Sequence, residues 1–159
     1  MASGQALFEP LAFQTGDELA AELDSRLQDF AKVIATAAVH NRNMAKLLIQ
    51  ITRGPEDPTR AALGFLVGRA AAEEGHEVSL FLAADAVQLL REPVLDSLVG
   101  LGTGSLRESY NALRAAGANF YVSGMSSKAR GFEPDGVAEP ALPAKLIQLT
   151  LEHDRVLSY

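Results

Sequence analysis

The sequence predicts a three-layer α/β/α domain with a mainly parallel sheet of four to five strands, preceded by an N-terminal amphipathic helix. An almost continuous apolar run at 47–51 has the pattern of a parallel strand buried on both faces. Two further strand patterns follow at 76–82 and 118–123, and helical patterns separate all of them. This alternation is the β-α-β order of a parallel sheet with right-handed crossovers. We place the N-terminal segment at 1–44 and the α/β domain at 45–159.

The N-terminal segment contains an irregular arm at 1–15 and then one long helix. Gly16-Asp17 offers a helix start, because an acidic side chain in the first turn favours the helix dipole. The helix ends near 41–43, and ~25 residues span about 38 Å, the width of a small domain. Two interpretations stay open: the helix covers its own domain, or it binds a partner and forms an oligomer. Its apolar face repeats every three or four positions, at Leu19, Leu23, Leu27, Phe30, Ile34 and Ala38.

Typical capping residues mark both ends of the helix in the first β-α-β unit. A turn-rich loop follows the first strand, and in it Asp57 is a natural N-cap with Pro58 at the first helical position. The helix continues through 61–71, and Gly75 ends it. Gly64 and Gly68 lie inside this helix without a nucleotide-binding ending, so we expect them to pack against the sheet.

The second half of the domain repeats the alternation less regularly. A helix capped by Ser105 ends at Gly117 and leads into the third strand. The sequence at 94–104 shows neither a clear helix pattern nor a clear strand pattern, so we assign it no secondary structure. The remaining predictions are a short helix at 86–91, a surface loop at 131–143, a helix at 142–151 and a last strand at 154–159.

The composition excludes several classes of protein. A net charge of −6 and a pI near 5.0 argue against nucleic-acid binding. The absence of cysteine excludes disulfides, thiolate metal sites and thiol catalysis in this chain. No apolar run approaches ~20 residues and no signal peptide is indicated, so we expect no membrane span and a cytoplasmic location. We expect no cofactor.

Ligands of parallel sheets gather beyond the carboxyl ends of the strands. Two predicted loops lie there, at 53–60 and 123–130, and each offers cations, hydroxyls and a helix start that suit a small anionic group. The alternative is that the hydroxyls only cap helices and the arginines are solvated. The candidate ligand-binding residues are Arg53, Thr59, Arg60, Ser123, Gly124, Ser126, Ser127, Lys128 and Arg130.

We predict no metal ligands and no catalytic residues. His40, His76 and His153 are far apart in the sequence and match no metal-binding spacing. Ser123 lies in no G-x-S-x-G turn, so it is a nucleophile only if the fold or a second subunit supplies a base. A serine hydrolase or transferase is therefore the least favoured alternative.

Three ordered segments resemble the DsrE/DsrF-like family. They are the β-α-β stretch at 54–82, the motif Tyr121-Val-Ser-Gly-Met-Ser-Ser-Lys-Ala-Arg-Gly, and the terminal strand at 154–159. The resemblance covers about 45–159 and implies a small α/β/α domain that forms homo- or hetero-oligomers. Sulfur-relay members carry persulfide sulfur on a cysteine in this loop. That cysteine falls at Ser123, and Ser126 stands where some members have a second.

The two serines change what the resemblance implies. A hydroxyl forms no persulfide and is far less nucleophilic than a thiol. We therefore expect an oligomeric subunit, not an enzyme, that binds a small ligand or a partner without covalent sulfur transfer. Two alternatives remain open: a structural subunit assembled through the N-terminal helix, or a sulfur carrier whose cysteine was changed to serine by engineering.

Overall fold

The structure is a computed structural model that describes residues 16–159, with the side chains of Glu18 and of residues 35–43 left out. The arm predicted at 1–15 lies outside the described residues. The chain divides after Arg42 into two compact units, which we describe separately. No helix in the described part is both long enough and apolar enough to cross a bilayer.

The first unit contains the helix α1 (Gly16–Asn43), which confirms the predicted N-terminal helix. Polar side chains pair along the helix: Arg26 Nε lies 2.8 Å from Glu22 Oε1, and Lys32 Nζ lies 3.3 Å from Asp29 Oδ1. Such pairs four or three residues apart support an exposed helix by a few tenths of a kcal/mol each, roughly. The large apolar side chains of α1 between residues 19 and 34 are exposed.

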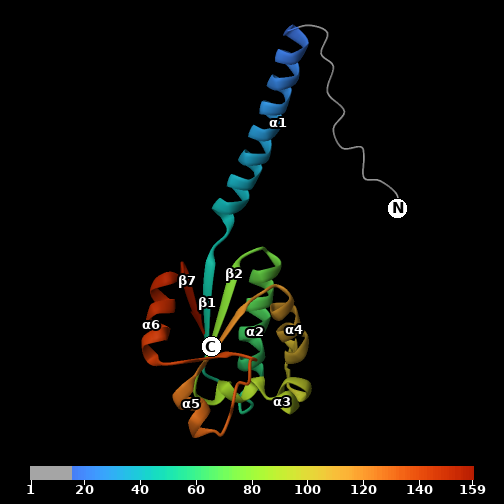
Figure 1. The fold of residues 1–159 in the computed structure, drawn as a ribbon. Helices are drawn as coiled ribbons and strands as arrows, with labels where there is room; N and C mark the ends of the chain where they lie inside the picture. The colour runs from blue at the N-terminus through green and yellow to red at the C-terminus, as the bar shows by residue number, and fades with distance from the viewer. Residues whose placement is uncertain (1–15) are drawn as a thin grey trace, which may run out of the picture. The chain divides into compact units, whose positions relative to one another are not determined.

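The second unit is built on a five-stranded parallel sheet with the order β6-β5-β2-β1-β7 (Figure 1). Every pair in this sheet is parallel, so β-α-β crossovers connect its strands. The predicted sheet of four to five mainly parallel strands is confirmed. The strands are β1 (Lys46–Ile51), β2 (Glu77–Leu82), β5 (Asn119–Ser123), β6 (Glu139–Ala141) and β7 (Arg155–Ser158).

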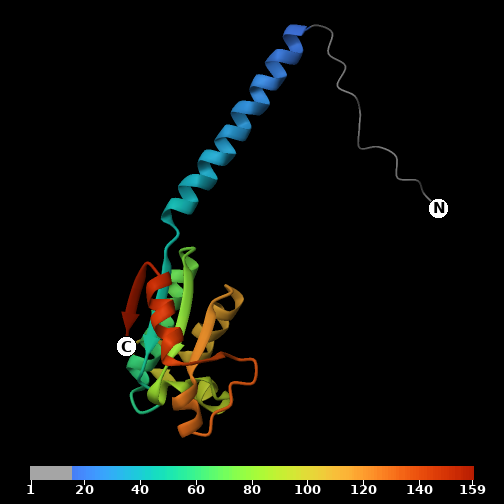
Figure 2. The ribbon, with the colours of Figure 1, turned by 60° about the vertical axis from the view of Figure 1, so that its left-hand side comes forward.

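Helices cover both faces of this sheet and so make the predicted three layers. α2 (Pro58–Glu73) and α4 (Leu106–Ala115) lie on one face, and α6 (Pro143–Glu152) lies on the other (Figures 1 and 2). The short elements are η1 (Ala84–Leu90), α3 (Glu92–Ser97), α5 (Gly124–Ala129) and the hairpin of β3 (Val99–Gly100) with β4 (Gly104–Ser105).

Two segments differ from the prediction. The surface loop predicted at 131–143 contains β6, which pairs in parallel with β5 and places Pro140 opposite Val122. Proline tolerates this position because β6 is an edge strand. The segment 124–129, which we predicted to be a polar loop with a helix start, is entirely the short helix α5. The unassigned segment 94–104 forms α3 and the small hairpin.

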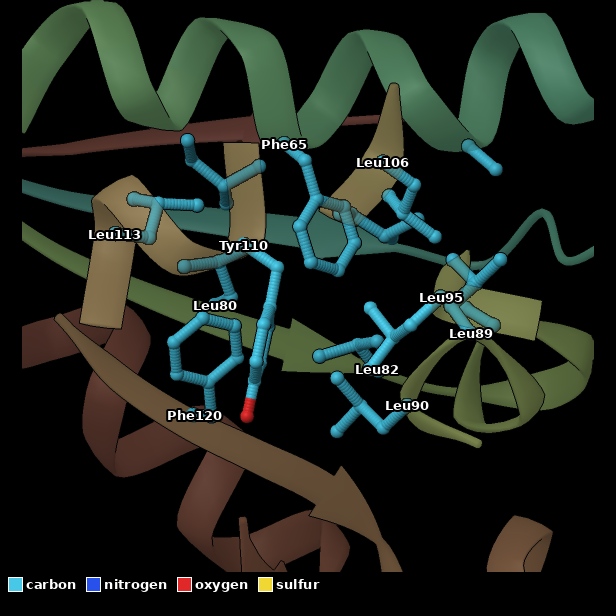
Figure 3. Packing of buried hydrophobic residues seen from close by; sticks show 14 of the residues in the cluster. Phe65, Leu80, Leu82, Leu89, Leu90, Leu95, Leu106, Tyr110, Leu113 and Phe120 are labelled. Carbon is cyan, nitrogen blue, oxygen red and sulfur yellow. The ribbon is translucent and has the colours of Figure 1, made fainter. Parts of the chain in front are cut away.

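The main core lies between the sheet and the helices α2 and α4 (Figure 3). Phe65 of α2 is fully buried, with its ring centroid 6.3 Å from that of Phe120; Tyr110 of α4 lies 5.3 Å from the same ring. Tilted aromatic pairs of this kind add about 0.5–1.5 kcal/mol beyond the area they bury. A smaller core lies on the opposite face, formed by Leu48, Phe81, Ala141 and Leu149.

The two glycines of α2 pack against β1, as predicted. A Cβ atom on Gly64 would lie 2.7 Å from Ile51 Cδ1, and one on Gly68 would lie 3.1 Å from Ile49 Cδ1. Both isoleucines are fully buried. The glycines therefore let the helix approach the strand closely.

Candidate functional site

Three neighbouring strands end at the same edge of the sheet. Because β2 lies between β1 and β5, the segment after β2 separates the two loops that we predicted to form a crevice. Our prediction missed this third segment, Ala83–Asp85. This segment could have been predicted from the sequence, because the loop that follows every parallel strand lies at the carboxyl edge of the sheet.

The loop after β1 contacts the segment after β2 through backbone. A Cβ atom on Gly54 would lie 2.4 Å from the backbone oxygen of Asp85, so only glycine fits here without movement. The Gly54 N–H donates to both carboxylate oxygens of Glu56 at 3.0 Å. Asp57 accepts from the backbone N–H of Arg60 at 3.2 Å and caps α2, as predicted.

Ser126 joins α5 to the segment after β2. Its hydroxyl accepts a hydrogen bond from the backbone N–H of Ala84 at 3.0 Å. Ala84 has a positive φ of 48°, a backbone conformation that non-glycine residues rarely adopt. The Ser126 hydroxyl therefore holds a strained turn in place.

Ser123 caps α5. Its hydroxyl accepts a hydrogen bond from the backbone N–H of Ser126 at 3.3 Å. This is the usual role of serine at an N-cap, where it satisfies a free donor of the first turn. The hydroxyls of Ser123 and Ser126 thus both take part in the local structure.

Arg130 and Asp85 form an ion pair across the same edge. Arg130 Nε lies 2.8 Å from Asp85 Oδ1, and the hydrogen bond from Arg130 holds the pKa of Asp85 below its usual value. Arg91 donates to the backbone oxygens of Arg130 and Gly131 at 2.7 and 3.0 Å. This arginine fixes the turn after α5.

The structure separates the predicted candidates by their partners. Thr59 accepts from the backbone N–H of Leu101 at 3.1 Å, and Arg60 lies 3.6 Å from Asp57. Arg53 and Lys128 are exposed, and neither forms an ion pair with any described residue. These two cations are the candidates that the fold leaves available.

An open cavity of about 280 Å³ lies beside α5. Ser127 lines it and is buried, with 5% of its surface exposed, and its hydroxyl has no hydrogen-bond partner among the described residues. A buried hydroxyl without a partner costs about 1–3 kcal/mol, so a ligand atom at this oxygen would be favourable. The other lining residues are Gly124, Lys128, Gly131, Phe132, Glu133, Pro134 and Pro140.

Ser123 forms no hydrogen bond to a base in the part of the chain that the structure describes. In residues 16–159 no hydrogen bond links its hydroxyl to a histidine or a carboxylate. His76 accepts from the backbone N–H of Ala45, and the Nδ1 of His153 lies 2.6 Å from Leu149 O. The described residues also contain no group of three histidine, cysteine, aspartate or glutamate side chains suited to a metal ion.

Two solved structures share this fold. The ychN protein from E. coli has 21% sequence identity and a TM-score of 0.62, over 73% of this chain and all of that one. A conserved protein of unknown function from Bacteroides thetaiotaomicron has 11% identity and a TM-score of 0.51, over 72% of this chain and 95% of that one. No curated protein matches the chain. The model of the DsrE/DsrF-like family matches residues 45–159, and the chain therefore belongs to that family.

Proposed function

We propose that this DsrE-family protein acts in the cytoplasm as an oligomeric subunit that binds a small anionic ligand or a sulfur-pathway partner without carrying sulfur covalently. The observation that carries the proposal is the structural use of both serine hydroxyls. Ser123 caps α5 and Ser126 holds the turn at Ala84, and the chain contains no thiol. A hydroxyl engaged in this way, with no hydrogen bond to a base among the described residues, is a poor nucleophile.

The binding surface in this proposal is the cavity beside α5 and the sheet edge next to it. Lys128 at the cavity rim supplies a positive charge, and the unpartnered hydroxyl of Ser127 supplies a buried polar group. Phe132, Pro134 and Pro140 provide an apolar wall. This combination of a few polar groups on apolar walls is typical of small-ligand sites.

The absence of covalent chemistry is tested by mass spectrometry after incubation with a polysulfide. We expect no sulfur adduct on the chain. The matched control is Ser123→Cys, because it places the chain's single thiol at the start of α5, where the backbone N–H groups favour the thiolate. That thiolate attacks a polysulfide S–S bond, keeps one sulfur as a persulfide and releases the shortened polysulfide.

We expect the Ser123→Cys protein to gain the mass of sulfur at position 123. The unmodified protein should gain none. An adduct on the unmodified chain would refute the claim that it carries no sulfur. If neither protein gains sulfur, the edge of this sheet does not suit persulfide chemistry even with a thiol, which would also remove the link to sulfur relay.

Ligand binding is tested separately, by following backbone amide signals in NMR during titration with thiosulfate or inorganic phosphate. We expect saturable shifts at Ser127 and Lys128, and roughly tenfold weaker binding in Lys128→Gln, because one charge-assisted contact is lost. Lys46→Gln is the matched control, because Lys46 is the first residue of β1 and therefore lies at the edge of the sheet opposite the candidate site. Equal weakening in both variants would indicate non-specific charge attraction, and no saturable shift would contradict the anion site.

A further inference from the structure

The apolar face of α1 follows a seven-residue repeat. With Ala20, Leu27 and Ile34 in the first core position of each heptad, Leu23 and Phe30 fall in the second. The sequence continues the same register with Ala37. The helix has 28 residues, and the repeat fills the core positions of three consecutive heptads, a pattern that indicates a coiled coil.

The core positions of this repeat from Ala20 to Ile34 are exposed on α1. Leu23 is 53% exposed, Leu27 is 66%, Phe30 is 65% and Ile34 is 54%. Leu19 and Val33 flank the seam at the positions just before Ala20 and Ile34, and they are exposed too. Helices of this kind gain most of their stability by packing an apolar face, so an exposed seam on a helix about 42 Å long requires a partner.

We infer that α1 pairs with α1 of a second copy of this chain, in a coiled coil whose core is formed by Leu23, Leu27, Phe30 and Ile34. The charged residues lie outside this seam. Glu22, Asp29 and Lys32 occupy the outer positions of the heptad, where they pair within their own helix. An identical helix offers the same repeat in the same length, so its side chains can fill the holes along the whole seam.

The charge of α1 argues against a membrane surface as the occupant. Residues 16–43 contain five acidic residues against three basic ones. Helices that lie on anionic lipid carry lysine and arginine on their polar face instead. The polar face of α1 would be repelled by such a surface, whereas a coiled coil leaves it in water.

The inference is tested on the full chain by sedimentation equilibrium. We expect Leu27→Glu to weaken self-association roughly tenfold or more, because a charge replaces a core leucine at the seam. Ser25→Glu is the matched control: Ser25 is exposed on the outer side of the same helix, so the same charge change there should leave association unchanged. A monomeric unmodified chain, or equal association of the two variants, would overturn the inference.

A second measurement identifies what α1 contacts. The chain has no cysteine, so one introduced thiol in α1 reports on pairing of α1 with α1. We mix Leu27→Cys with Phe30→Cys and oxidise mildly, which covers both the parallel and the antiparallel arrangement. Disulfide-linked dimers should form much faster than with Ser25→Cys. Equal rates would place α1 on an α/β domain, its own or another copy's, and would overturn the coiled coil without affecting the ligand proposal.

Discussion

The helices α1 and α2 are both rich in alanine and leucine, yet they complete their packing in different ways. α2 buries Phe65 beside Phe120 and packs two glycines against β1 within its own domain. α1 has a phenylalanine of its own, Phe30, and 65% of it is exposed. The two aromatic residues thus report on two kinds of stability. Phe65 reports on folding of the α/β domain, and in the coiled coil that we infer Phe30 reports on assembly.

The difference follows from the shape of the apolar face. In α2 the face is flattened by Gly64 and Gly68, which suits close contact with a sheet. In α1 the face is a ridge of large side chains in a seven-residue repeat, which suits interdigitation with another helix. An apolar pattern therefore indicates that a helix packs against another element. The sizes of its apolar residues indicate whether that element is a sheet or another helix.

The largest expected effect comes from the two phenylalanines. Phe65→Ala should destabilise the α/β domain by about 3–5 kcal/mol, because it leaves a cavity in a fully packed core. Phe30→Ala should change the unfolding free energy of that domain by about 0.5 kcal/mol or less, while weakening self-association. Urea unfolding and sedimentation of both variants measure the two quantities. The contrast between the helices fails if Phe30→Ala unfolds the domain as readily.

Two adjacent serines of α5 extend the contrast to polar groups. Ser126→Ala should destabilise the domain by about 1–3 kcal/mol, because the Ala84 N–H loses its acceptor inside the protein. Ser127→Ala removes a buried hydroxyl that has no partner among the described residues, so it should be neutral or slightly stabilising. Thermal unfolding ranks the two. A larger loss from Ser127→Ala would show that this hydroxyl is bonded in solution.

Substitution of glycine tests the flat face of α2 directly. Gly64→Ala should cost about 1–2 kcal/mol, since the new Cβ would lie 2.7 Å from Ile51 and this clash exceeds the gain in helix propensity. Gly16→Ala at the start of α1 meets no atom within 4 Å and should cost nothing. Chemical denaturation measures both. Equal stability of the two variants would mean that α2 can move away from β1.

The smallest effect expected near neutral pH concerns the ion pair at the sheet edge. The hydrogen bond from Arg130 lowers the pKa of Asp85 in the folded state, so the pair stabilises the protein above the unfolded pKa of about 3.9. That contribution disappears as the pH falls through the lower folded pKa. Stability curves of the unmodified protein and Asp85→Asn should therefore converge in acid.

The matched control for this pair is Asp135→Asn. Asp135 is exposed and forms no ion pair with the described residues. Its curve should stay parallel to that of the unmodified protein at every pH. A gap between the Asp85→Asn and unmodified curves that persists well below pH ~3 would contradict the assigned cause.

The sequence alone predicted the layers, the parallel sheet and the helix before it, because short apolar runs and helical repeats are local patterns. It also placed Asp57 as a helix cap and the α2 glycines against the sheet. β6 was missed because an edge strand of three residues with a proline carries almost no pattern of its own. Pairing with β5, and not its own propensity, makes it a strand.

The candidate site was predictable in position but not in detail. Ser123 and Ser126 were expected at a strand end, since their loop follows a buried strand. Strand order is not local, and only the structure placed β2 between β1 and β5. Asp85 and Arg130 are far apart in the sequence, and tertiary packing brings them together at 2.8 Å. The same packing decides which hydroxyls form hydrogen bonds, and it leaves the hydroxyl of Ser127 without a partner among the described residues. The sequence could not show this, because the hydrogen-bond partners inside a fold are often residues far apart in the chain.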